Sequence, residues 1–298
     1  MAKRSYHISK IFPMHKSTAH IHFLPKESRT MDVNCYTATI RRINYLNLEI
    51  YDFSSARLDP KWHGDHSVLP VNRLYLPKSG TAYIAVGENK IHMRPGMAYL
   101  IPAGASMDHR CDTTMDKLFF HFNLYKPDRY DALFGFNAIY EIPLEPEQLE
   151  RLYCHADAGT IYNSFIIKSI LYDLLARFQH KYNLISEHIP IYSKTVMSTI
   201  AYIHENLSAN LRLEDLAKHS FVSRSTLTEQ FRKEVGTSLG KYIDDQLIAA
   251  AQRELSQSNR SIGEISNALG YSNQCYFSRR FKQMCGMTPQ LYRIRTKA

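Results

Sequence analysis

Closely spaced pairs of histidines are the residues of this chain that could hold a metal ion. His20 and His22 are two residues apart, so both imidazoles would lie on one face of a strand. His63 and His66 bracket Gly64-Asp65 in a sequence typical of a loop. Neither pair has a third ligand at the spacing of a metal site. We therefore favour solvated or hydrogen-bonded histidines, and expect no catalytic residues and no cofactor.

Polar and basic side chains gather in two stretches of similar pattern toward the carboxyl end. The first stretch runs from Leu213 to Lys233 and the second from Ile262 to Lys282. Each predicts a short amphipathic helix, a tight turn and a second helix opened by a small polar cap. In a helix-turn-helix unit the first helix braces the second, whose exposed first turn faces the major groove of DNA. The pattern therefore indicates two such units.

The apolar residues of both stretches recur at spacings that bury one side of each helix. We expect the helices of each unit to pack through Leu216, Ala217, Leu227 and Phe231 in the first, and through Ile265, Ala268, Phe277 and Phe281 in the second. These positions belong to a core under any function. The residues that remain outward are polar and basic, which suits contact with nucleic acid.

The second stretch also carries a family resemblance. Its sequence from Gly270 to Lys282, GYSNQCYFSRRFK, and the following Gly286 to Arg293, GMTPQLYR, resemble the signature of AraC/XylS-type regulators. The resemblance extends back through Gly236-Thr237-Ser238 and Tyr242-Ile243 to about Ser193. It implies a sequence-specific DNA-binding transcription regulator, usually an activator, with double-stranded DNA and RNA polymerase as partners.

The resemblance also implies which side chains face DNA. Two units joined by a connecting helix, about Leu239 to Ser256, would enter successive turns of the major groove. By position, the first reading helix presents Arg224, Ser225, Thr228 and Glu229, and the second presents Asn273, Gln274, Cys275 and Arg279. Arg279 could pair with guanine and Gln274 with adenine, each discriminating between bases by about 1–3 kcal/mol. The alternative for each residue is phosphate contact or solvation.

Two positions depart from the family pattern. Many relatives carry arginine where this chain has Leu247, and often a basic or amide residue where it has Glu229. Glu229 could accept a hydrogen bond from a cytosine amino group, or it could weaken affinity for the DNA backbone. The operator sequence of a relative therefore does not transfer to this chain.

Short alternating runs between residues 35 and 125 predict many strands, such as TAYIAV at 81–86 and LFFHFN at 118–123. Turn signals separate the runs, at Lys78-Ser79-Gly80, Gly87-Glu88-Asn89, Arg94-Pro95-Gly96 and Pro102-Ala103-Gly104. Strands at this spacing favour an antiparallel sandwich or barrel. A mixed α/β domain is the alternative, although no helical pattern interrupts the runs.

In AraC/XylS-type regulators such a domain commonly resembles a cupin-type ligand-binding barrel, and Met93 to Gly104, ahead of His109, resembles part of its floor. A barrel mouth encloses a small molecule between aromatic walls and a few polar groups. The side chains that we expect to bind an effector are Trp62, Arg73, Tyr83, Tyr99, His109 and His121. Trp62 is the first candidate among them, because tryptophan can stack on a sugar or aromatic ring. Ordinary barrel filling is the alternative for each.

Three classes of function remain open. The first is a regulator gated by a small molecule, and the frequency of carbohydrate control among relatives with a barrel favours a sugar or sugar derivative. The second is a constitutive DNA binder whose β-domain only dimerises. The third is a metal-dependent cupin enzyme, for which only His109 falls near an expected ligand position.

A helical pattern begins at Pro146. Leu149 and Leu152 open a short helix, and an apolar stripe follows from Ile161 to Phe178. This stripe is a dimer seam, or it packs against the β-domain, or it does both. The segment ISEHIP at 185–190 predicts a linker ended by proline.

These patterns predict an α+β chain of two domains. A cupin-like antiparallel β-barrel with a helical pair, for ligand sensing and dimerisation, would occupy residues 1–185, and a linker 186–192. An all-α DNA-binding domain with two helix-turn-helix units would occupy 193–298. A chain of 298 residues is long enough for two domains with separate cores.

The charge, the hydropathy and the cysteines indicate the partner and the cellular compartment. The net charge is +9, and residues 193–298 hold 15 Lys and Arg against 9 Asp and Glu, which indicates an acidic partner for this part. No apolar run approaches the roughly 18 residues of a membrane span, and no secretory signal is visible. The 5 cysteines form no CxxC pair, which is typical of free buried thiols in a reducing compartment. We expect a cytoplasmic homodimer with no membrane contact.

Overall fold

The computed structural model describes residues 40–156 and 159–297. The histidine pair His20 and His22 and the thiol of Cys35 lie outside the described residues. The amino-terminal part of the described chain is a β-domain followed by two helices, and the remainder is helical.

Antiparallel strands build the β-domain. They are β1 (Asn47–Leu58), β2 (His63–Val68), β3 (Asn72–Gly80), β4 (Ala82–Val86), β5 (Asn89–Met93), β6 (Met97–Ile101), β7 (Ser106–Arg110), β8 (Met115–Tyr125) and β9 (Tyr140–Pro143). The predicted turn signals fall at the junctions from β3 to β7. At Gly80, which ends β3, φ is +73° and a side chain would overlap the Thr114 carbonyl group. The predicted antiparallel architecture is confirmed, and the mixed α/β alternative is wrong.

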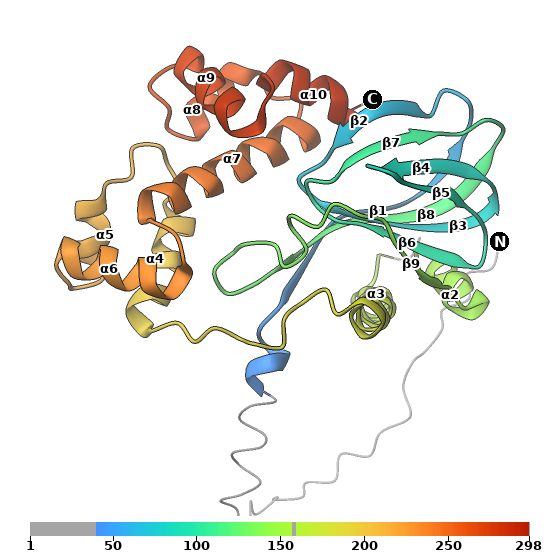
Figure 1. Cartoon of the computed structure of the whole chain (residues 1–298), viewed down its shortest axis with the longest axis horizontal. Helices are drawn as coiled ribbons and strands as arrows, with labels where there is room; N and C mark the ends of the chain where they lie inside the picture. Colours follow the sequence, from blue (N-terminus) through green and yellow to red (C-terminus); the bar gives the residue numbers. More distant parts are fainter. Residues whose placement is uncertain (1–39, 157–158, 298) are drawn as a thin grey trace, which may run out of the picture. The chain divides into compact units, whose positions relative to one another are not determined.

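Two sheets face each other across a core (Figure 1). The larger sheet has the strand order β1-β8-β3-β6-β9, and the smaller has β2-β7-β4-β5. Side chains alternate along β3, so Leu74 and Leu76 belong to one core, whereas Tyr75 belongs to the core between the sheets. Arg73 shares the face of Tyr75. The alternation therefore places a charged side chain in the interior of the sandwich.

Helices α2 (Pro146–Ala156) and α3 (Ile161–Tyr182) cover the outer face of the larger sheet (Figure 1). The second half of α3 packs on that sheet through buried residues that include Leu171 and Phe178. The first half exposes Ile161 (77%) and Phe165 (69%). The predicted apolar stripe therefore packs on the β-domain from Ile166 onward, whereas Ile161 and Phe165 remain exposed.

The rest of the described chain consists of helices and their connections, and the shortest of these helices have 7 residues. They are α4 (Lys194–Glu205), α5 (Leu213–His219), α6 (Arg224–Val235), α7 (Leu239–Gln257), α8 (Ile262–Ala268), α9 (Gln274–Cys285) and α10 (Pro289–Lys297). One core packs α4, α5 and α6 against the start of α7, and a second packs α8, α9 and α10 against its remainder. Leu239 belongs to the first core and Leu255 to the second. The predicted connecting helix is confirmed, and it is shared by both units.

Two details of the predicted packing are wrong. Ala268 is exposed, because α8 buries Ile265 and Ser266 and is followed by the buried Leu269, so Ala268 faces outward. The expected burial of the thiols holds for Cys111 but fails for Cys154 and Cys275, which are exposed and free. Each of these two lies on the outer side of an amphipathic helix, α2 or α9.

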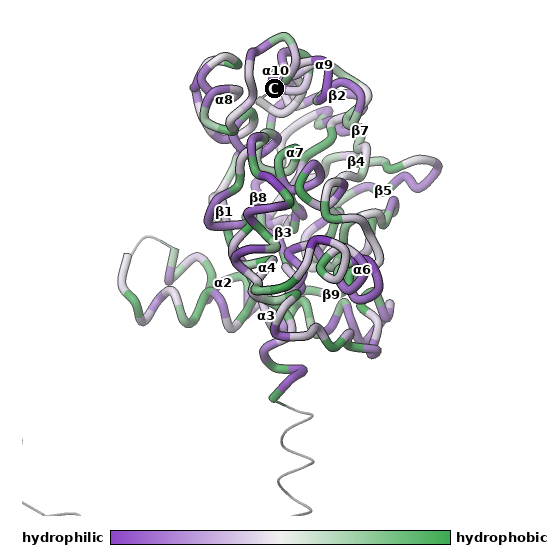
Figure 2. Tube along the Cα trace, turned by 90° about the vertical axis from the view of Figure 1, so that its left-hand side faces the viewer, coloured by the Kyte–Doolittle hydropathy of each residue, from purple (hydrophilic) through white to green (hydrophobic). Residues whose placement is uncertain are grey.

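Hydrophilic and hydrophobic residues alternate along the helices (Figure 2). Among residues 40–156 and 159–297, no helix is both long enough and apolar enough to cross a membrane. Leu247 is buried in the second helical core, so the leucine that departs from the family pattern is a packing residue here.

Candidate nucleic-acid interface and effector site

Both helix-turn-helix units open their second helix with a polar cap. The Ser223 hydroxyl accepts a hydrogen bond from the Thr226 N–H at 3.1 Å, at the start of α6. The Asn273 side chain accepts one from the Tyr276 N–H at 2.8 Å, at the start of α9. These bonds satisfy backbone donors that a helix start leaves free. The cap therefore fixes where each helix begins and which side chains lie on its first turn.

The turns before these helices need a backbone with positive φ. In the second unit this residue is Gly270, with φ +74°, and a side chain there would overlap the Ser208 hydroxyl. In the first unit it is Phe221, with φ 54° and an exposed fraction of 95%. The same turn is therefore made by glycine in one unit and by an unpacked phenylalanine in the other.

The predicted reading residues of the first unit lie together on the outer side of α6. Arg224, Ser225 and Glu229 are exposed, and Thr228 is half-buried with its hydroxyl donating to the Arg224 carbonyl at 2.8 Å. All of them line one open hollow beside α6, which Arg232 and Lys233 extend. The Arg224 guanidinium also forms an ion pair of 2.7 Å with Glu214 of α5. The first helix of this unit thereby positions a side chain of the second.

The predicted reading residues of the second unit are exposed on α9 and at its cap. They are Asn273, Gln274, Cys275 and Arg279. The amide oxygen of Asn273 is occupied by the cap, so mainly its N–H groups remain for a base. Tyr276 is also exposed (48%) on the same turn. The sequence did not single it out, because an aromatic residue next to Phe277 is typical of a buried core position.

Neighbouring arginines on α9 have different partners. Arg280 donates to Asp244 of α7 and, at 2.7 Å, to Gln283. This contact with Asp244 raises the pKa of the Arg280 guanidinium. Arg279 is exposed on the adjacent face. Arg280 therefore ties α9 to the shared helix, and Arg279 is the exposed arginine of the two.

The predicted effector residues occupy the sandwich, with one exception. Tyr99 is buried between the sheets, and His109 pairs across strands with Ile84, which belongs to the same core. His121 is the strand partner of Arg73, so both lie on the inner face of the larger sheet. Tyr83, in contrast, packs on His92 and faces away from that core. Its neighbour Ile84 takes the inward position, so Tyr83 lies outside that core, although it lines an open hollow together with His109.

Trp62 and His109 form the edge of the interior. Their rings are 4.4 Å apart between centroids. A Cβ atom at Gly64 would lie 2.7 Å from the His109 ring, so glycine at this point of β2 leaves the room that the imidazole needs. Burial is the first cause that lowers the pKa of His109 to about 4, and the nearby Arg73 and Lys117 add to it. The imidazole is therefore neutral at neutral pH.

The inner face of the larger sheet is basic. Arg73 is fully buried and donates to the Ala105 carbonyl at 2.9 Å. Lys117, which the sequence did not single out, is 3% exposed and lies over the Tyr75 ring at 3.3 Å from its centroid. Burial, opposed by Asp52 and aided by Arg73, also lowers the pKa of His121 to about 4. The sequence held an indication of this position. Lys117 is four residues before His121, and a strand places side chains an even number of residues apart on the same face.

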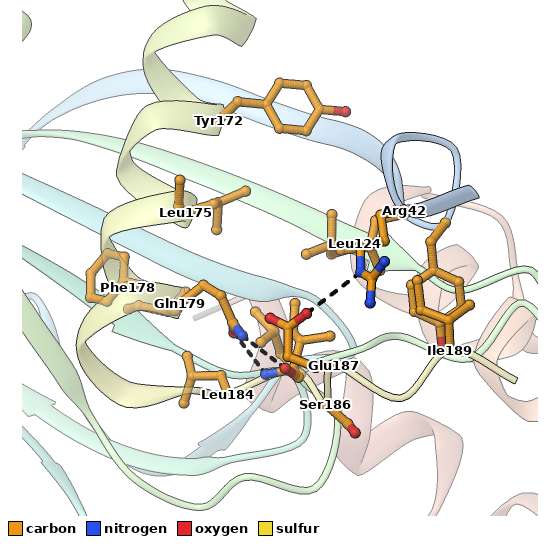
Figure 3. A pocket seen from close by; sticks show the side chains of 16 residues that line it. Arg42, Leu124, Tyr172, Leu175, Phe178, Gln179, Leu184, Ser186, Glu187 and Ile189 are labelled. Atoms are coloured by element: carbon orange, nitrogen blue, oxygen red, sulfur yellow. Dashed lines mark hydrogen bonds and ion pairs between the residues drawn. The ribbon is translucent and has the colours of Figure 1, made fainter. Parts of the chain in front are cut away.

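A separate apolar pocket of about 300 Å³ lies between the larger sheet, α3 and residues 184–189 (Figure 3). Arg42 and Glu187 form an ion pair of 3.7 Å at it, and Gln179 exchanges two hydrogen bonds of 2.8 Å with the backbone of Ile185. None of the predicted effector residues lines this pocket. Sequence reasoning missed it because its walls come from distant segments that only packing brings together.

In the part of the chain that the structure describes, no three His, Cys, Asp or Glu side chains gather as ligands for a metal ion. The expectation of a loop at the second histidine pair is wrong, because His63 and His66 both lie in β2, at a register shift between Gly64 and Ser67, and His66 pairs with Asp108 at 3.5 Å.

Comparison with known proteins agrees with the geometry of the helical part. A helix-turn-helix domain family matches residues 216–295. The transcriptional activator AarP of Providencia stuartii is 34% identical over 108 residues, which are 36% of this chain and 80% of AarP. Two helix-turn-helix units on a shared helix thus define a DNA-binding transcription regulator. The chain belongs to the AraC/XylS family of these regulators.

Other relatives align over most of both chains. The raffinose operon transcriptional regulatory protein RafR of Pediococcus pentosaceus is 23% identical over 230 residues, 74% of this chain and 83% of RafR. Among solved structures, ToxT of Vibrio cholerae is 13% identical with a TM-score of 0.45, covering 86% of this chain and all of ToxT (100%).

Proposed function

We propose that this regulator binds DNA through α6 and α9 and responds to a small molecule held between the two sheets of the β-domain. The observation that carries the proposal is the exposure of the polar starts of α6 and α9, on two units that pack around α7. Such a pair of helices can enter adjacent segments of the major groove.

The DNA contacts divide between the two helices. Arg224, Ser225, Thr228 and Glu229 contact DNA from α6, and Asn273, Gln274, Cys275 and Arg279 contact it from α9 and its cap. Arg279 pairs with a guanine and Gln274 with an adenine. Asn273 donates to DNA through its side-chain Nδ2, which in the unbound protein donates to the Ser272 hydroxyl at 3.4 Å. The remaining side chains contact phosphates or single base edges.

The effector site consists of Trp62, Arg73, Tyr99, His109 and His121, which share the interior of the sandwich. Bound effector would favour one arrangement of the DNA-binding domains over another. The relative named for the raffinose operon favours a sugar or sugar derivative as the signal. The relative named as an activator favours activation, through contact with RNA polymerase.

Dimerisation would use the exposed half of α3. Ile161, Tyr162 and Phe165 form an apolar surface there, with exposed fractions between 66% and 77%. A second candidate function follows from the same surface: a constitutive DNA binder whose β-domain only dimerises. The packed interior between the sheets favours that candidate, since effector binding requires side chains to move.

A thermal-shift screen of the full-length protein against sugars, sugar acids and small aromatic metabolites tests the proposal. A ligand that binds only the folded state raises its stability by RT ln(1 + [L]/Kd). We expect a shift in the full-length protein, no shift in residues 193–298 alone, and loss of the shift in Trp62→Ala. Absence of any specific shift would favour the constitutive dimer.

A further inference from the structure

Two cations are buried on the inner face of the larger sheet. Arg73 of β3 is 0% exposed and Lys117 of β8 is 3% exposed. These strands are neighbours, with Arg73 opposite His121 and Lys117 opposite Pro77. Both side chains are therefore held by the register of a central strand pair.

Neither cation is neutralised by a carboxylate within residues 40–156 and 159–297. Arg73 donates to the carbonyl groups of Ala105 at 2.9 Å and Ser67 at 3.5 Å and to the Tyr75 hydroxyl, none of which is a carboxylate, and its Nε has no partner. The Lys117 ammonium faces rings, at 3.3 Å from the centroid of Tyr75 and 4.7 Å from that of Trp62. No ion pair among the described residues includes either side chain. A buried cation without a paired anion destabilises a fold, so an anion placed between Arg73 and Lys117 would stabilise the charged form of both side chains.

We infer that the packed interior between the two sheets, once Trp62 moves aside, binds the oxyanion of a small molecule, a carboxylate or a phosphate, through Arg73 and Lys117. The rings of Trp62, Tyr75 and Phe119 would contact its apolar or planar body, because they already surround the Lys117 ammonium. This inference rests on the proposed effector site and names its ligand class. A sugar acid or an aromatic acid satisfies it, whereas a neutral sugar leaves both cations uncompensated.

Trp62 is the side chain that can open the site. It is half-buried at the edge of the interior core, whereas Tyr75 and Tyr99 are buried within it. It comes just before β2 and covers both His109 and Lys117. Since the chain has 1 tryptophan, its fluorescence reports on this position alone.

Binding would also change protonation. Burial, aided by Arg73, lowers the pKa of Lys117 well below its ordinary value, and a bound anion would raise it again. The titratable groups that act on this cluster from neighbouring strands and helices are Asp52, His63, Tyr75, Asp108, Cys111 and Tyr292. We expect proton uptake on binding, and affinity that falls as pH rises between the free and the bound pKa of Lys117.

Matched pairs of probes test the charge. The full-length protein is titrated with benzoate and benzamide, phenyl phosphate and phenol, and glucuronate and glucose, with Trp62 fluorescence and melting temperature as readouts. We expect one anion to bind at least about tenfold more tightly than its neutral partner, because charge-assisted hydrogen bonds form only with the anion. The pair that shows the preference tells a carboxylate from a phosphate.

Two variants locate the preference. Lys117→Met should abolish it, whereas Lys90→Met, at an exposed lysine of β5, should retain it. Lys117→Met should melt no lower than the wild type, because it replaces an unpaired buried cation with an apolar chain of similar length. Arg73→Met is the second variant, should Lys117→Met not fold.

The outcomes separate the two proposals. Equal binding of anionic and neutral partners, or a preference that survives Lys117→Met and Arg73→Met, overturns the anion assignment and leaves the effector site standing. If no probe of any pair changes fluorescence or melting temperature at millimolar concentration, the anion assignment and the effector site between the sheets are both rejected.

Discussion

At the scale of single residues, the partners of a side chain decide its task. Arg279 and Arg280 are adjacent on α9, yet Arg280 is bonded to Asp244 of α7 while Arg279 is exposed. Sequence reasoning selected Arg279 by its position in a motif, and it could not see the bond of Arg280 because Asp244 lies on another helix.

Replacing Arg279 with alanine should weaken binding to the specific operator by about 1–3 kcal/mol and relax the preference at one base pair. A binding-site selection on the wild type and the variant measures both effects. Lys282→Ala, at another exposed cation of α9, is the control and should weaken binding without changing selectivity. Unchanged selectivity in Arg279→Ala would show that this arginine contacts only phosphates.

His121 should make the fold sensitive to acid. Its pKa in the folded protein is about 4, below the ordinary value of about 6.5, so the unfolded chain binds more protons between these pH values. Stability is therefore complete above pH 6.5 and lost as pH falls toward 4, by about 2 kcal/mol at pH 5 from this residue. Urea unfolding at pH 7 and pH 5 measures the loss.

The variant His121→Asn should reduce that acid sensitivity, while His92→Asn, at an exposed histidine of β5, should not. The reduction should be partial, because burial also lowers the pKa of His109 and of His204 to about 4. Equal pH dependence in wild type and His121→Asn would contradict the assigned pKa.

At the scale of helices, strands and turns, local rules explain most of what could be foreseen. The strands from β3 to β7 were predictable because glycine and proline stand at their ends. The position of Tyr83 outside the core between the sheets was not predictable, because Ala82, Tyr83 and Ile84 are all compatible with an inward position and the alternation gave no phase. Which residues of α3 pack on the sheet is decided by tertiary packing, which no local pattern reveals.

The turn at Phe221 stores strain that a glycine would relieve. A non-glycine residue with φ 54° is disfavoured, and an exposed fraction of 95% means that the ring contributes little packing. Phe221→Gly should stabilise the protein by about 0.5–1 kcal/mol, net of the greater freedom of glycine in the unfolded chain. Phe221→Ala removes the ring and keeps the strain, so it should show no such gain. The midpoint of urea unfolding decides between them.

The exposed half of α3 should carry the dimer. Phe165→Glu should weaken self-association at least about tenfold, because each buried phenylalanine is worth about 1.5–3 kcal/mol. Lys168→Glu, at an exposed polar position of the same helix, should leave it unchanged. Sedimentation equilibrium measures both. A dimer of equal strength in Phe165→Glu would place the interface elsewhere.

At the scale of the whole molecule, the helical part has its own cores. Both are formed largely by residues between 193 and 298, around α7. The motifs that identify the family were visible in the sequence because they are local and gapless. The alternation phase of Lys117 was visible too, but the rings around its ammonium and the pocket beneath residues 184–189 were not, because tertiary packing alone determines them.

Residues 193–298 alone should therefore fold and bind DNA. Binding should weaken steeply with salt, since each phosphate contact releases counterions. Circular dichroism checks the fold, and electrophoretic mobility shift at low salt checks binding. A helical fragment that fails to bind would mean that the β-domain is required for DNA binding itself.

The shared helix α7 also fixes the distance between the two helix-turn-helix units. Its 19 residues extend over about 28 Å at a rise of 1.5 Å per residue, which approaches the roughly 34 Å of one helical turn of DNA. Both units pack on this one rod, so their spacing is not adjustable by a flexible tether. A new operator for this regulator can therefore differ in the base pairs within each half-site. Inserting base pairs between the two half-sites should prevent both units from binding at the same time.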